Sequence, residues 1–555
     1  MRGDPAPLSP PARGCAVKKS VARAVRLPLR SHLAAVALGV TLGLTFSGGA
    51  AAQSTSFTRA LAEAASQSDS IAAFYRLRGY QTLWTGPEDA TRREAFLTAL
   101  DGAAVQGLPA ARYGRADLVA AFRSAVTEGD RGRLEVAMSR AFVAWATDIE
   151  SGAIDPKKVD KTILREILRP EPGQLLAALA GSEPRSYLAS LGPRTPEYAR
   201  LVKEKLRLEG VIAAGGWGAD LPGTLKPGAV GAGTVALRER LVALGYLPPS
   251  SAGSYDKTLV RAVQRFQTDQ GIAADGVVGD STLAALNTAP EERLKAVVVA
   301  LERLRWMGDA PRGSRHIWVN QPDFTARIVD DGRVTFQTRA VIGKNVPDQR
   351  TPEFSDEMEY MVVNPSWGVP RSIIVKEYLP LLQRNPNAVS HLQVVDGRGR
   401  VVPRGAVNFA AYSARSFPFG LRQPPSDGNA LGKVKFMFPN ENNIYLHDTP
   451  AKNLFSHEVR AYSHGCIRLG DPFDFAYTLL AAQTDDPKGV FKHELDSNKE
   501  SNLALQQHVP VHLVYFTAWP TARGTIGYRN DIYGRDAAIF EALTEAGVVL
   551  PDVQG

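Results

Sequence analysis

Residues 463–468 read Ser463-His464-Gly465-Cys466-Ile467-Arg468, a polar segment that contains a glycine. An inert buried cysteine would normally lie in an apolar run, so these neighbours favour a reactive thiol. The chain contains one further cysteine, Cys15, within a stretch that has the features of a removable leader. The mature protein would then keep Cys466 without an intramolecular disulfide partner. We interpret Cys466 as a nucleophile, the alternative being an inert core thiol.

A cysteine nucleophile needs a base, because a free thiol with a pKa of about 8.5 is only partly ionised near neutrality. His447 lies 466 − 447 = 19 residues before Cys466, at the end of a predicted strand and before the turn Asp448-Thr449-Pro450. The intervening loop is long enough to double back and bring imidazole and thiol together. We predict that His447 accepts the thiol proton, either in a resting ion pair or only when substrate arrives.

The remaining residues of the segment have predicted supporting roles. We expect Ser463 and His464 to shape the loop, because His464 is too close in sequence to point readily at the sulfur. Gly465 permits a positive φ and the close approach of a substrate carbonyl. The backbone N–H groups of Gly465 and Cys466 would then form an oxyanion hole. Arg468 would either form a structural ion pair or contact a substrate carboxylate.

The histidine and cysteine pattern does not indicate a metal site. His508 and His512 are four residues apart, but Pro510 between them argues against a helix. On a strand their rings would stand ~13 Å apart. The sequence also lacks a second cysteine ligand for zinc. We therefore expect neither a metal nor another cofactor.

Around this segment the spacing of apolar residues is that of strands. The predicted strands are residues 316–320, 325–329, 334–341, 360–363, 433–438, 444–447 and 512–516. Asp330-Asp331-Gly332 joins two of them as a hairpin, and Gly470-Asp471-Pro472 is typical of a helix start directly after the nucleophile. These features predict a β-rich catalytic domain over residues 313–537, followed by a C-terminal tail over 538–555.

Residues 368–432 interrupt these strands. They combine a predicted helix near 375–382 with several Gly and Pro turns, and they end shortly before the His447 segment. We predict an insertion that covers the site as a lid or substrate-binding flap.

A small helical unit precedes the β-rich region, over residues 230–289. Leu237, Leu241 and Leu244 line a first helix, and Asp256 can cap a second helix. The spaced motifs Leu-Gly-Tyr-Leu (244–247), Val-Gln-Arg-Phe-Gln (263–267) and Asp-Gly-Val-Val-Gly (275–279) resemble the small three-helix peptidoglycan-binding domain. The alternative is a generic helical spacer.

Helical periodicity dominates residues 53–225, and one more amphipathic helix is predicted within 290–312. We interpret these two parts as one helical scaffold, which the second helix completes. The predicted fold class is therefore α+β and multi-domain: a helical scaffold, a small three-helix domain and a β-rich catalytic domain.

The first 52 residues carry most of the basic excess. The chain has a formal charge of 65 − 57 = +8, of which residues 1–52 hold 7 − 1 = +6. The rest of the chain gives little support for a nucleic-acid-binding face. Basic residues up to Arg30 precede an apolar run of about 14 residues and the small residues Ala50-Ala51-Ala52, as in an export signal. The run is shorter than the ~20 residues of a spanning helix, so we predict a cleaved signal peptide and a periplasmic protein rather than an uncleaved anchor.

Ser463-His464-Gly465-Cys466-Ile467-Arg468 preceded by His447 resembles the signature of L,D-transpeptidases. The order of leader, helical region, small domain and catalytic domain resembles their large multi-domain periplasmic branch. Asn364-Pro365-Ser366-Trp367 and the segments 444–450 and 514–519 extend the resemblance. It implies that Trp367 and Tyr445 lie in the substrate cleft, although hydrophobic packing would also explain either residue.

The resemblance also implies a reaction and its partners. The Cys466 thiolate would attack the carbonyl of the diamino-acid third residue of a tetrapeptide stem, the terminal D-alanine would leave, and a thioester would form. An amine of a second stem would then join the two third residues. The partners would be peptidoglycan stem peptides and glycan, with membrane contact only through the leader.

Several alternatives share part of this evidence. Water as the acceptor would give an L,D-carboxypeptidase or a cross-link hydrolase, and a protein lysine would give attachment to an outer-membrane protein. A non-catalytic wall-binding scaffold would leave Cys466 and His447 without a role. An exported cysteine protease would normally carry a papain-like Cys-Trp sequence, which is absent here.

Overall fold

The computed structural model describes residues 48–550, with side chains described from residue 55 onward. The chain divides into two units at residue 52, the second of which is Gln53–Gly555. Residues 1–47 of the expected leader lie outside the described part of the chain. Every element after α1 (Gly48–Ala65) belongs to the second unit. Within the described residues, no helix has both the length and the apolar character needed to cross a membrane.

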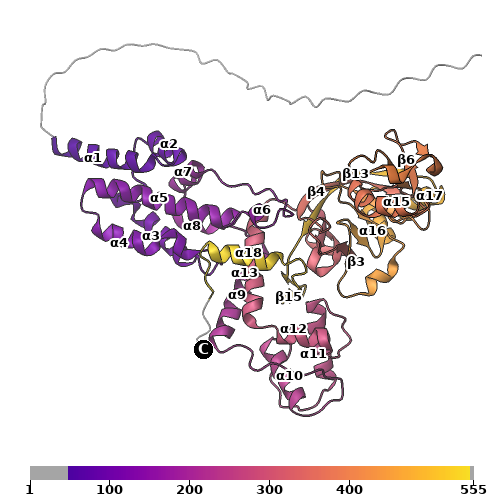
Figure 1. Ribbon diagram of the computed structural model, residues 1–555. Coiled ribbons are helices and arrows are strands. Elements are labelled where there is room, and N and C mark those ends of the chain that lie inside the picture. Colours follow the sequence, from indigo (N-terminus) through magenta and orange to yellow (C-terminus); the bar gives the residue numbers. More distant parts are fainter. Residues whose placement is uncertain (1–47, 551–555) are drawn as a thin grey trace, which may run out of the picture. The chain divides into compact units, whose positions relative to one another are not determined.

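Most of the scaffold helices pack around one core (Figure 1). The helices over residues 156–159 and 196–213 contribute instead to a second core. Its further helices are α2 (Asp69–Leu77), α3 (Ala90–Asp101), α4 (Arg115–Ser124), α5 (Glu128–Ser151), α6 (Pro156–Val159), α7 (Pro172–Gly181), α8 (Pro184–Ser190) and α9 (Pro196–Ala213). The long helix α5 begins at a capping box, in which Thr127 and Asp130 satisfy each other's backbone N–H groups. Trp84, Phe96 and Phe142 pack against one another in the core, with ring centroids 5.3 to 5.8 Å apart.

The small unit contains α10 (Ala232–Ala243), α11 (Lys257–Gln270) and α12 (Asp280–Asn287). Asp256 caps α11 as expected, since its carboxylate accepts the N–H of Leu259 at 2.8 Å. The Gln267 side chain holds the turn before α12, bonding Asp275 and the N–H of Gly276 at 2.8 Å each. The unit has its own core of leucines, Val263 and Phe266.

Helix α13 (Pro290–Met307) connects this unit to the β-rich region and is buried on most of its surface. It packs against α9, α5 and the C-terminal helix α18 (Arg535–Glu545). Arg303 within it forms ion pairs with Glu353 and Asp536. Because α18 begins at Arg535, the boundary expected at residue 537 falls inside a helix, and Ile539 and Leu543 beyond it are buried in the shared core.

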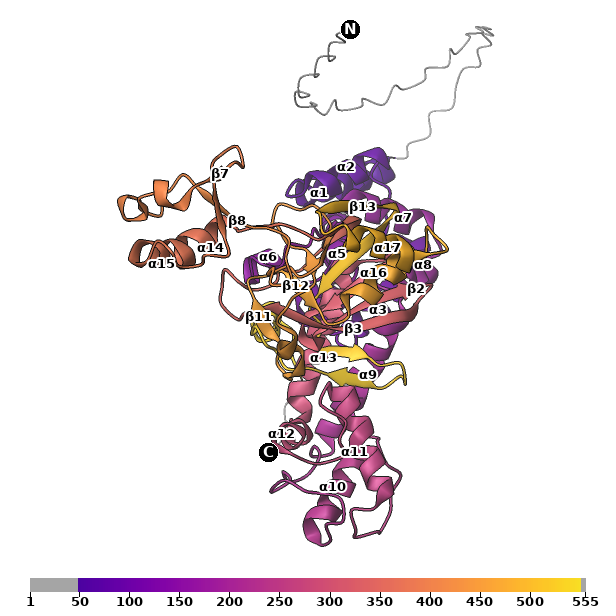
Figure 2. The ribbon, with the colours of Figure 1, turned by 90° about the vertical axis from the view of Figure 1, so that its right-hand side faces the viewer.

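The β-rich region is built on a nine-stranded sheet with the order β11-β3-β12-β10-β9-β4-β13-β1-β2. Figure 2 labels β2, β3, β11, β12 and β13 of this sheet. Its strands are β1 (Arg315–Asn320), β2 (Thr325–Asp330), β3 (Arg333–Gly343), β4 (Phe354–Val363), β9 (Val434–Met437), β10 (Leu446–His447), β11 (Ala461–Ser463), β12 (Ile467–Leu469) and β13 (Ser501–Val514). The further pairing of β2 with β3 closes the sheet on itself. Two helices, α16 (Pro472–Leu480) and α17 (Pro487–Asp496), pack on each other and against this sheet. A short hairpin of β14 (Ala518–Pro520) and β15 (Ile526–Tyr528) precedes α18.

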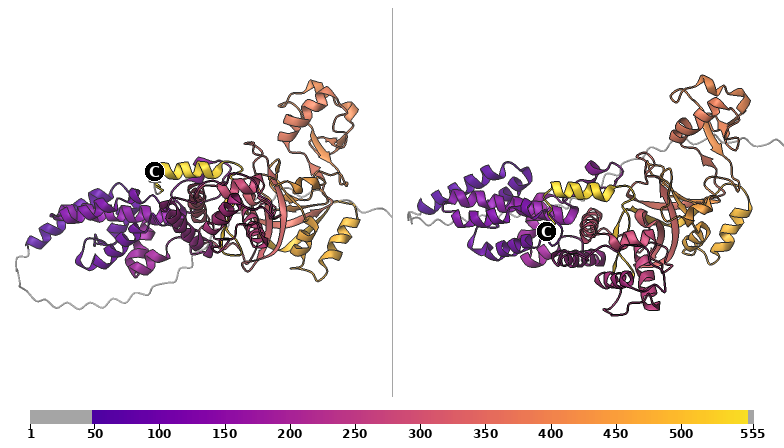
Figure 3. Two further views of the ribbon diagram at one scale, coloured as in Figure 1. Left: turned by 90° about the horizontal axis from the view of Figure 1, so that it is seen from below. Right: turned by 60° about the horizontal axis from the view of Figure 1, so that its bottom comes forward.

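The insertion predicted over 368–432 forms its own small structure between β4 and β9 (Figure 3). It contains β5 (Trp367–Gly368), α14 (Arg371–Ile373), a π-helical turn at Ile374–Tyr378, α15 (Leu379–Arg384), β6 (Gln393–Val395), β7 (Val401–Val402) and β8 (Gly420–Gln423). These strands make a separate sheet in the order β5-β8-β6-β7. A separate apolar core, which includes Ile373, Leu382 and Phe409, supports them. The expected α+β multi-domain fold is thus confirmed.

Candidate active site

Cys466 and His447 lie on neighbouring strands of the large sheet. His447 ends β10, and Cys466 directly precedes β12. The two strands run parallel, with Leu446 level with Ile467 and His447 level with Arg468. The loop between them therefore doubles back, and Cys466 lies level with Tyr445.

A cavity of about 560 Å³ opens at this end of the two strands. Seven of the eight predicted site residues line it: Trp367, Tyr445, His447, Ser463, His464, Cys466 and Arg468. Gly465 does not line the cavity. The insertion also contributes to the lining, through residues such as Lys376, Glu377 and His391.

The thiol of Cys466 is neutral in this setting. Burial raises its pKa to about 11, while contacts with Tyr445 and the charge of Arg468 act in the opposite direction. The Sγ–H group donates to the carbonyl oxygen of Asn443 at 3.5 Å. A protonated thiol is therefore the resting form.

His447 is buried and neutral as well. Burial lowers its pKa to about 3, with the Arg468 charge contributing, although the carbonyls of Asp448 and Leu431 oppose the shift. Its Nδ1 lies 2.5 Å from the Asp448 carbonyl oxygen. A carbonyl only accepts, so Nδ1 carries the proton and Nε2 holds the lone pair. Of the two alternatives that the sequence leaves open, these shifts favour a resting neutral pair over a resting ion pair, because burial acts against the charged form of each group.

Asp448 fixes the turn that carries this carbonyl. Its buried carboxylate accepts the N–H groups of Lys433 and Thr449 at 2.9 and 2.7 Å and pairs with Lys452 at 2.7 Å. The turn was visible in the sequence, but the role of Asp448 in orienting His447 was not. The structure also identifies the group that orients the histidine as a backbone carbonyl.

Ser463 closes the loop of residues 463–466, which carries the candidate nucleophile and is called the nucleophile loop below. Its hydroxyl donates to the Cys466 carbonyl at 2.5 Å and accepts the Gly465 N–H at 3.2 Å. Gly465 has a φ of +118°, and a Cβ there would lie 3.1 Å from Ile444, so glycine fits this position best. Because Ser463 engages the Gly465 N–H, this amide is not the expected oxyanion donor in this geometry. The amide of Cys466 remains the candidate.

His464 faces the insertion rather than the thiol. Its Nε2 lies 2.7 Å from Glu377 Oε1, on the π-helical turn. Beside this contact Lys376 pairs with Asp348 from the loop after β3. His464 therefore joins the nucleophile loop to the insertion, a partner that sequence reasoning missed because 87 residues separate the two.

Arg468 contributes a fixed charge to the cavity. Its Nε is buried without a hydrogen-bond partner, and no ion pair to it occurs among the described residues. Burial lowers the pKa of its guanidinium, while interaction with Cys466 acts in the opposite direction. The described residues therefore form no structural ion pair with Arg468. Contact with a substrate carboxylate is the other role expected for it.

The two aromatic residues line the cavity next to the thiol. The rings of Tyr445 and His447 are 5.7 Å apart, and Trp367 packs edge-on against Tyr378 of the insertion at 6.5 Å. Tyr445 interacts with both Cys466 and Trp367, and burial raises the pKa of its hydroxyl. The Tyr445 side chain thus connects β10 with the start of the insertion.

No group of three His, Cys, Asp or Glu side chains suited to a metal occurs among residues 55–550. His512 is buried, with Nδ1 2.8 Å from Ser355 Oγ and Nε2 2.9 Å from the Arg312 carbonyl. His508 lies instead near Glu357, at 3.8 Å. The two histidines therefore have separate partners.

Comparison with known proteins places three segments in families. Residues 314–489 match the model named YkuD, the L,D-transpeptidase catalytic domain. Residues 69–204 match a scaffold domain, and residues 230–286 match a domain named "Putative peptidoglycan binding domain".

Two curated relatives share parts of the sequence. A protein of Haemophilus influenzae named "Putative L,D-transpeptidase" is 34% identical over 242 residues, which cover 43% of this chain and 47% of that protein. The N-acetylmuramoyl-L-alanine amidase CwlL of Bacillus licheniformis is 47% identical over 64 residues, which cover 11% of this chain and 18% of the amidase. The chain thus spans about half or less of the length of these relatives.

Solved structures of two L,D-transpeptidases also align with this chain. That from Xylanimonas cellulosilytica is 17% identical, covering 54% of this chain and 100% of its own, with a TM-score of 0.17. That from Stackebrandtia nassauensis is 16% identical, covering 52% and 94%, with a TM-score of 0.22.

Most of the closed sheet, together with the Cys466 segment, lies within the region that matches an enzyme catalytic domain. More specifically, the chain carries an L,D-transpeptidase catalytic domain and a peptidoglycan-binding domain. The resemblance read from the motifs is confirmed at this level.

Proposed function

We propose that this protein cross-links peptidoglycan stem peptides through a thioester on Cys466. One observation carries the proposal: a half-buried thiol and a buried imidazole, with its lone pair on Nε2, line the same cavity. The L,D-transpeptidase catalytic domain supports the reaction class. The three-helix unit supports a peptidoglycan substrate.

Acylation begins with both groups neutral. As Sγ attacks the carbonyl carbon of the third stem residue, the thiol proton passes to Nε2 of His447 and the carbonyl electrons move to oxygen. The tetrahedral intermediate collapses, the bond to the terminal D-alanine breaks, and the leaving amine takes the proton from His447. The product is a thioester with the thiol proton now on D-alanine.

Deacylation reverses these roles. The amine of a second stem attacks the thioester carbonyl and gives its proton to His447. The carbon–sulfur bond breaks, Sγ takes that proton, and the two third residues are joined by an amide. Because both resting pKa values oppose charge separation, we expect proton transfer to accompany carbonyl attack rather than precede it.

Arg468 supports recognition of an anionic substrate. A half-buried guanidinium with an unpartnered buried Nε, and with no carboxylate partner among the described residues, favours a ligand that brings a carboxylate. Stem peptides end in a carboxylate, so Arg468 would bind that group or the side-chain carboxylate of the diamino acid. A cell-wall substrate supports action outside the cytoplasm, and the proposal includes the periplasm as the location, reached through the expected leader.

Muropeptide analysis tests the proposal. The mature protein is incubated with disaccharide tetrapeptides, and the products are separated and sequenced by mass spectrometry. Dimers joined through their third residues are the expected result. Tripeptides alone would instead identify an L,D-carboxypeptidase, and unchanged tetrapeptides would contradict the proposal.

Cys466→Ala is the matched variant for this experiment. We expect it to form neither dimers nor tripeptides, because it lacks the nucleophile. Its thermal unfolding midpoint should stay close to that of the wild type, since Cys466 is only half-buried at the cavity edge. Cross-links formed by this variant would show that Cys466 is not the nucleophile.

A further inference from the structure

Thr351 connects the nucleophile loop to the body of the catalytic domain. Its side chain is fully buried in the loop between β3 and β4. The hydroxyl accepts the Gly343 N–H at 2.9 Å and donates to the Gly465 carbonyl at 2.7 Å. A Cβ on Gly343 would lie 2.7 Å from the Thr351 nitrogen, so the backbone at the end of β3 and the backbone of this loop are in close contact, with no room for a side chain at Gly343.

The hydrogen bond to Gly465 sets the orientation of one peptide group. In a planar trans peptide the C=O of one residue and the N–H of the next point in opposite directions. The Gly465 carbonyl points at Thr351, which does not line the cavity. The Cys466 N–H therefore points away from Thr351, on the side where Cys466 itself lines the cavity. The Tyr445 carbonyl accepts the N–H of Ile467, the next residue, at 3.1 Å.

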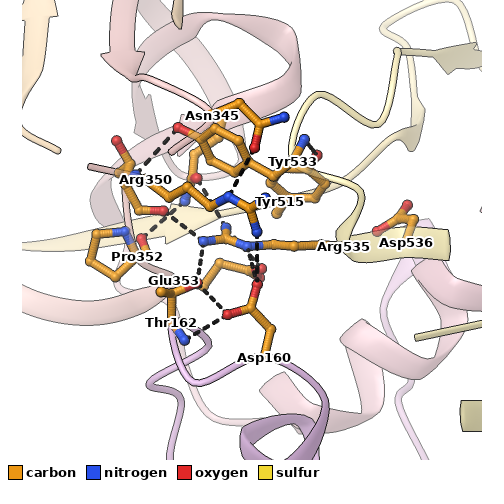
Figure 4. A network of polar contacts seen from close by, with 12 residues as sticks. Asp160, Thr162, Asn345, Arg350, Pro352, Glu353, Tyr515, Tyr533, Arg535 and Asp536 are labelled. Carbon is orange, nitrogen blue, oxygen red and sulfur yellow. Dashed lines mark hydrogen bonds and ion pairs between the residues drawn. The ribbon is translucent and has the colours of Figure 1, made fainter. Parts of the chain in front are cut away.

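Thr351 is itself held in place by its backbone. Its carbonyl accepts Arg535 Nη2 at 2.9 Å, and its N–H donates to the Tyr533 hydroxyl at 3.3 Å. Arg535 is anchored in turn by Asp160 at 3.1 Å and by Thr162 at 2.6 Å, both from the scaffold (Figure 4). The hydroxyl that meets Gly465 thus sits on a fixed segment.

We infer that Thr351 is a positioning residue for acyl transfer, which holds the Gly465–Cys466 peptide so that the Cys466 N–H faces the oxygen of the tetrahedral intermediate. The inference rests on the proposed function, because it assigns the oxyanion donor of that reaction. The Gly465 N–H already donates to the Ser463 hydroxyl, so the Cys466 N–H is the candidate donor in this loop. A donor fixed in advance stabilises the developing charge without reorganisation.

Thr351→Val tests the inference, because valine keeps the shape and loses the hydroxyl. Two acyl donors are used. Reaction with the tetrapeptide stem is measured by the release of D-alanine, and reaction with p-nitrophenyl acetate is measured by the burst of p-nitrophenolate. We expect kcat for both to fall roughly 10- to 100-fold, with KM within about twofold, as for a misplaced oxyanion donor. Alkylation of Cys466 by iodoacetamide forms no oxyanion, so its rate should stay within about twofold of the wild type.

Two further variants separate positioning from folding. Thr351→Ser keeps the hydroxyl and should restore most of kcat. Thr325→Val removes the hydroxyl of another buried threonine of this domain, one that donates to Asp323 at 2.8 Å and does not contact the nucleophile loop. It should leave kcat unchanged. If Thr351→Val does not fold, as judged by its unfolding transition, Thr351→Ala replaces it with the same expectation.

Three outcomes would overturn the inference: wild-type kcat in the hydroxyl-free variant, an equal fall in alkylation and acylation, or no recovery with serine. Loss of the proposed function would look different. A wild-type protein that acylates with p-nitrophenyl acetate but not with stem peptide would contradict the substrate assignment, while the ester still decides the role of Thr351. A wild type inert to both donors would contradict both.

Discussion

At the scale of single residues, burial controls the chemistry of Cys466 and His447. Each group loses hydration in its charged form, so the pKa of the thiol rises and that of the imidazole falls. An ion pair at the surface would show the opposite shifts. These shifts favour a neutral Cys466 thiol and a neutral His447 imidazole in the resting protein.

The pH dependence of alkylation follows from these shifts. With a pKa of about 11, the thiolate fraction of Cys466 near neutral pH is roughly 100-fold or more below that of a free thiol. We expect the rate with iodoacetamide to rise about tenfold per pH unit from pH 7 to pH 9.5 without a plateau. The denatured protein, as a control, should level off near the pKa of an ordinary cysteine. A plateau of the native protein below pH 8 would contradict the neutral pair.

His447→Ala gives the matched variant for this profile. Acylation should fall by roughly 10²-fold or more, because the general base is lost. The alkylation profile should keep its slope, since no ion pair exists to be broken. A loss of alkylation at neutral pH in this variant would show that His447 already holds a thiolate.

At the scale of elements, two polar contacts join the insertion to the catalytic domain beside the cavity. Glu377 meets His464, and Lys376 meets Asp348. All four side chains are partly exposed, so each contact contributes little to stability, and the Lys376–Asp348 pair is weakened by salt. The π-helical turn presents both residues together, a local geometry often found at functional sites.

Glu377→Gln should loosen this contact. A stem peptide would touch both sides of the cavity, so we expect its KM to rise by roughly two- to fivefold with kcat nearly unchanged. The burst with p-nitrophenyl acetate should not change, because a small ester needs only the thiol side. Lys492→Gln, which breaks an exposed pair with Asp496, is the control and should leave both substrates unaffected. A change in kcat for the small ester would mean that Glu377 acts on the nucleophile loop itself.

Elements with a clear period could be predicted from sequence, and short ones could not. The predicted strands near 316–341 are rich in apolar and β-branched residues, and they match β1 to β3 closely. In contrast, β13 begins at Ser501 although only 512–516 was predicted, because polar residues and an irregular register between Ala504 and Val509 hide its period. Strands as short as β10 and β12 have no period to detect.

The candidate site divides in the same way. Cys466 and His447 could be found because the motif places them within one local stretch. Thr351 and Glu377 could not, because they reach the nucleophile loop through contacts across 114 and 87 residues of chain. The protonation states were also beyond sequence, since they depend on how much water the fold removes.

At the scale of the whole molecule, ionic contacts connect the domains of residues 53–550 with one another. Arg535 and Arg303 connect the scaffold, α13 and the catalytic domain through Asp160, Glu353 and Asp536. The three-helix unit docks on the β14–β15 hairpin, where Asp269 pairs with Arg523 and accepts the Thr525 hydroxyl at 2.8 Å. The binding unit and the catalytic domain thus share a defined contact.

Removal of residues 230–289 should separate binding from chemistry. We expect the shortened protein to lose most of its co-sedimentation with purified sacculi, because the matched peptidoglycan-binding domain lies there. Its burst with p-nitrophenyl acetate should persist, since none of these residues lines the Cys466 cavity. Cys466→Ala should sediment like the wild type. Unchanged retention of the shortened protein would contradict the binding role.

The protonated state of Cys466 also bears on the chemical lifetime of the enzyme. Peroxides oxidise thiolates much faster than thiols, and the later steps of that oxidation are irreversible. Relative to an unperturbed cysteine, the raised pKa removes most of the species that a peroxide attacks. A protein that works beyond the reach of cellular reductants would thereby keep its sulfur in the reduced, usable form between turnovers, and would expose a reactive anion only while a substrate occupies the cavity.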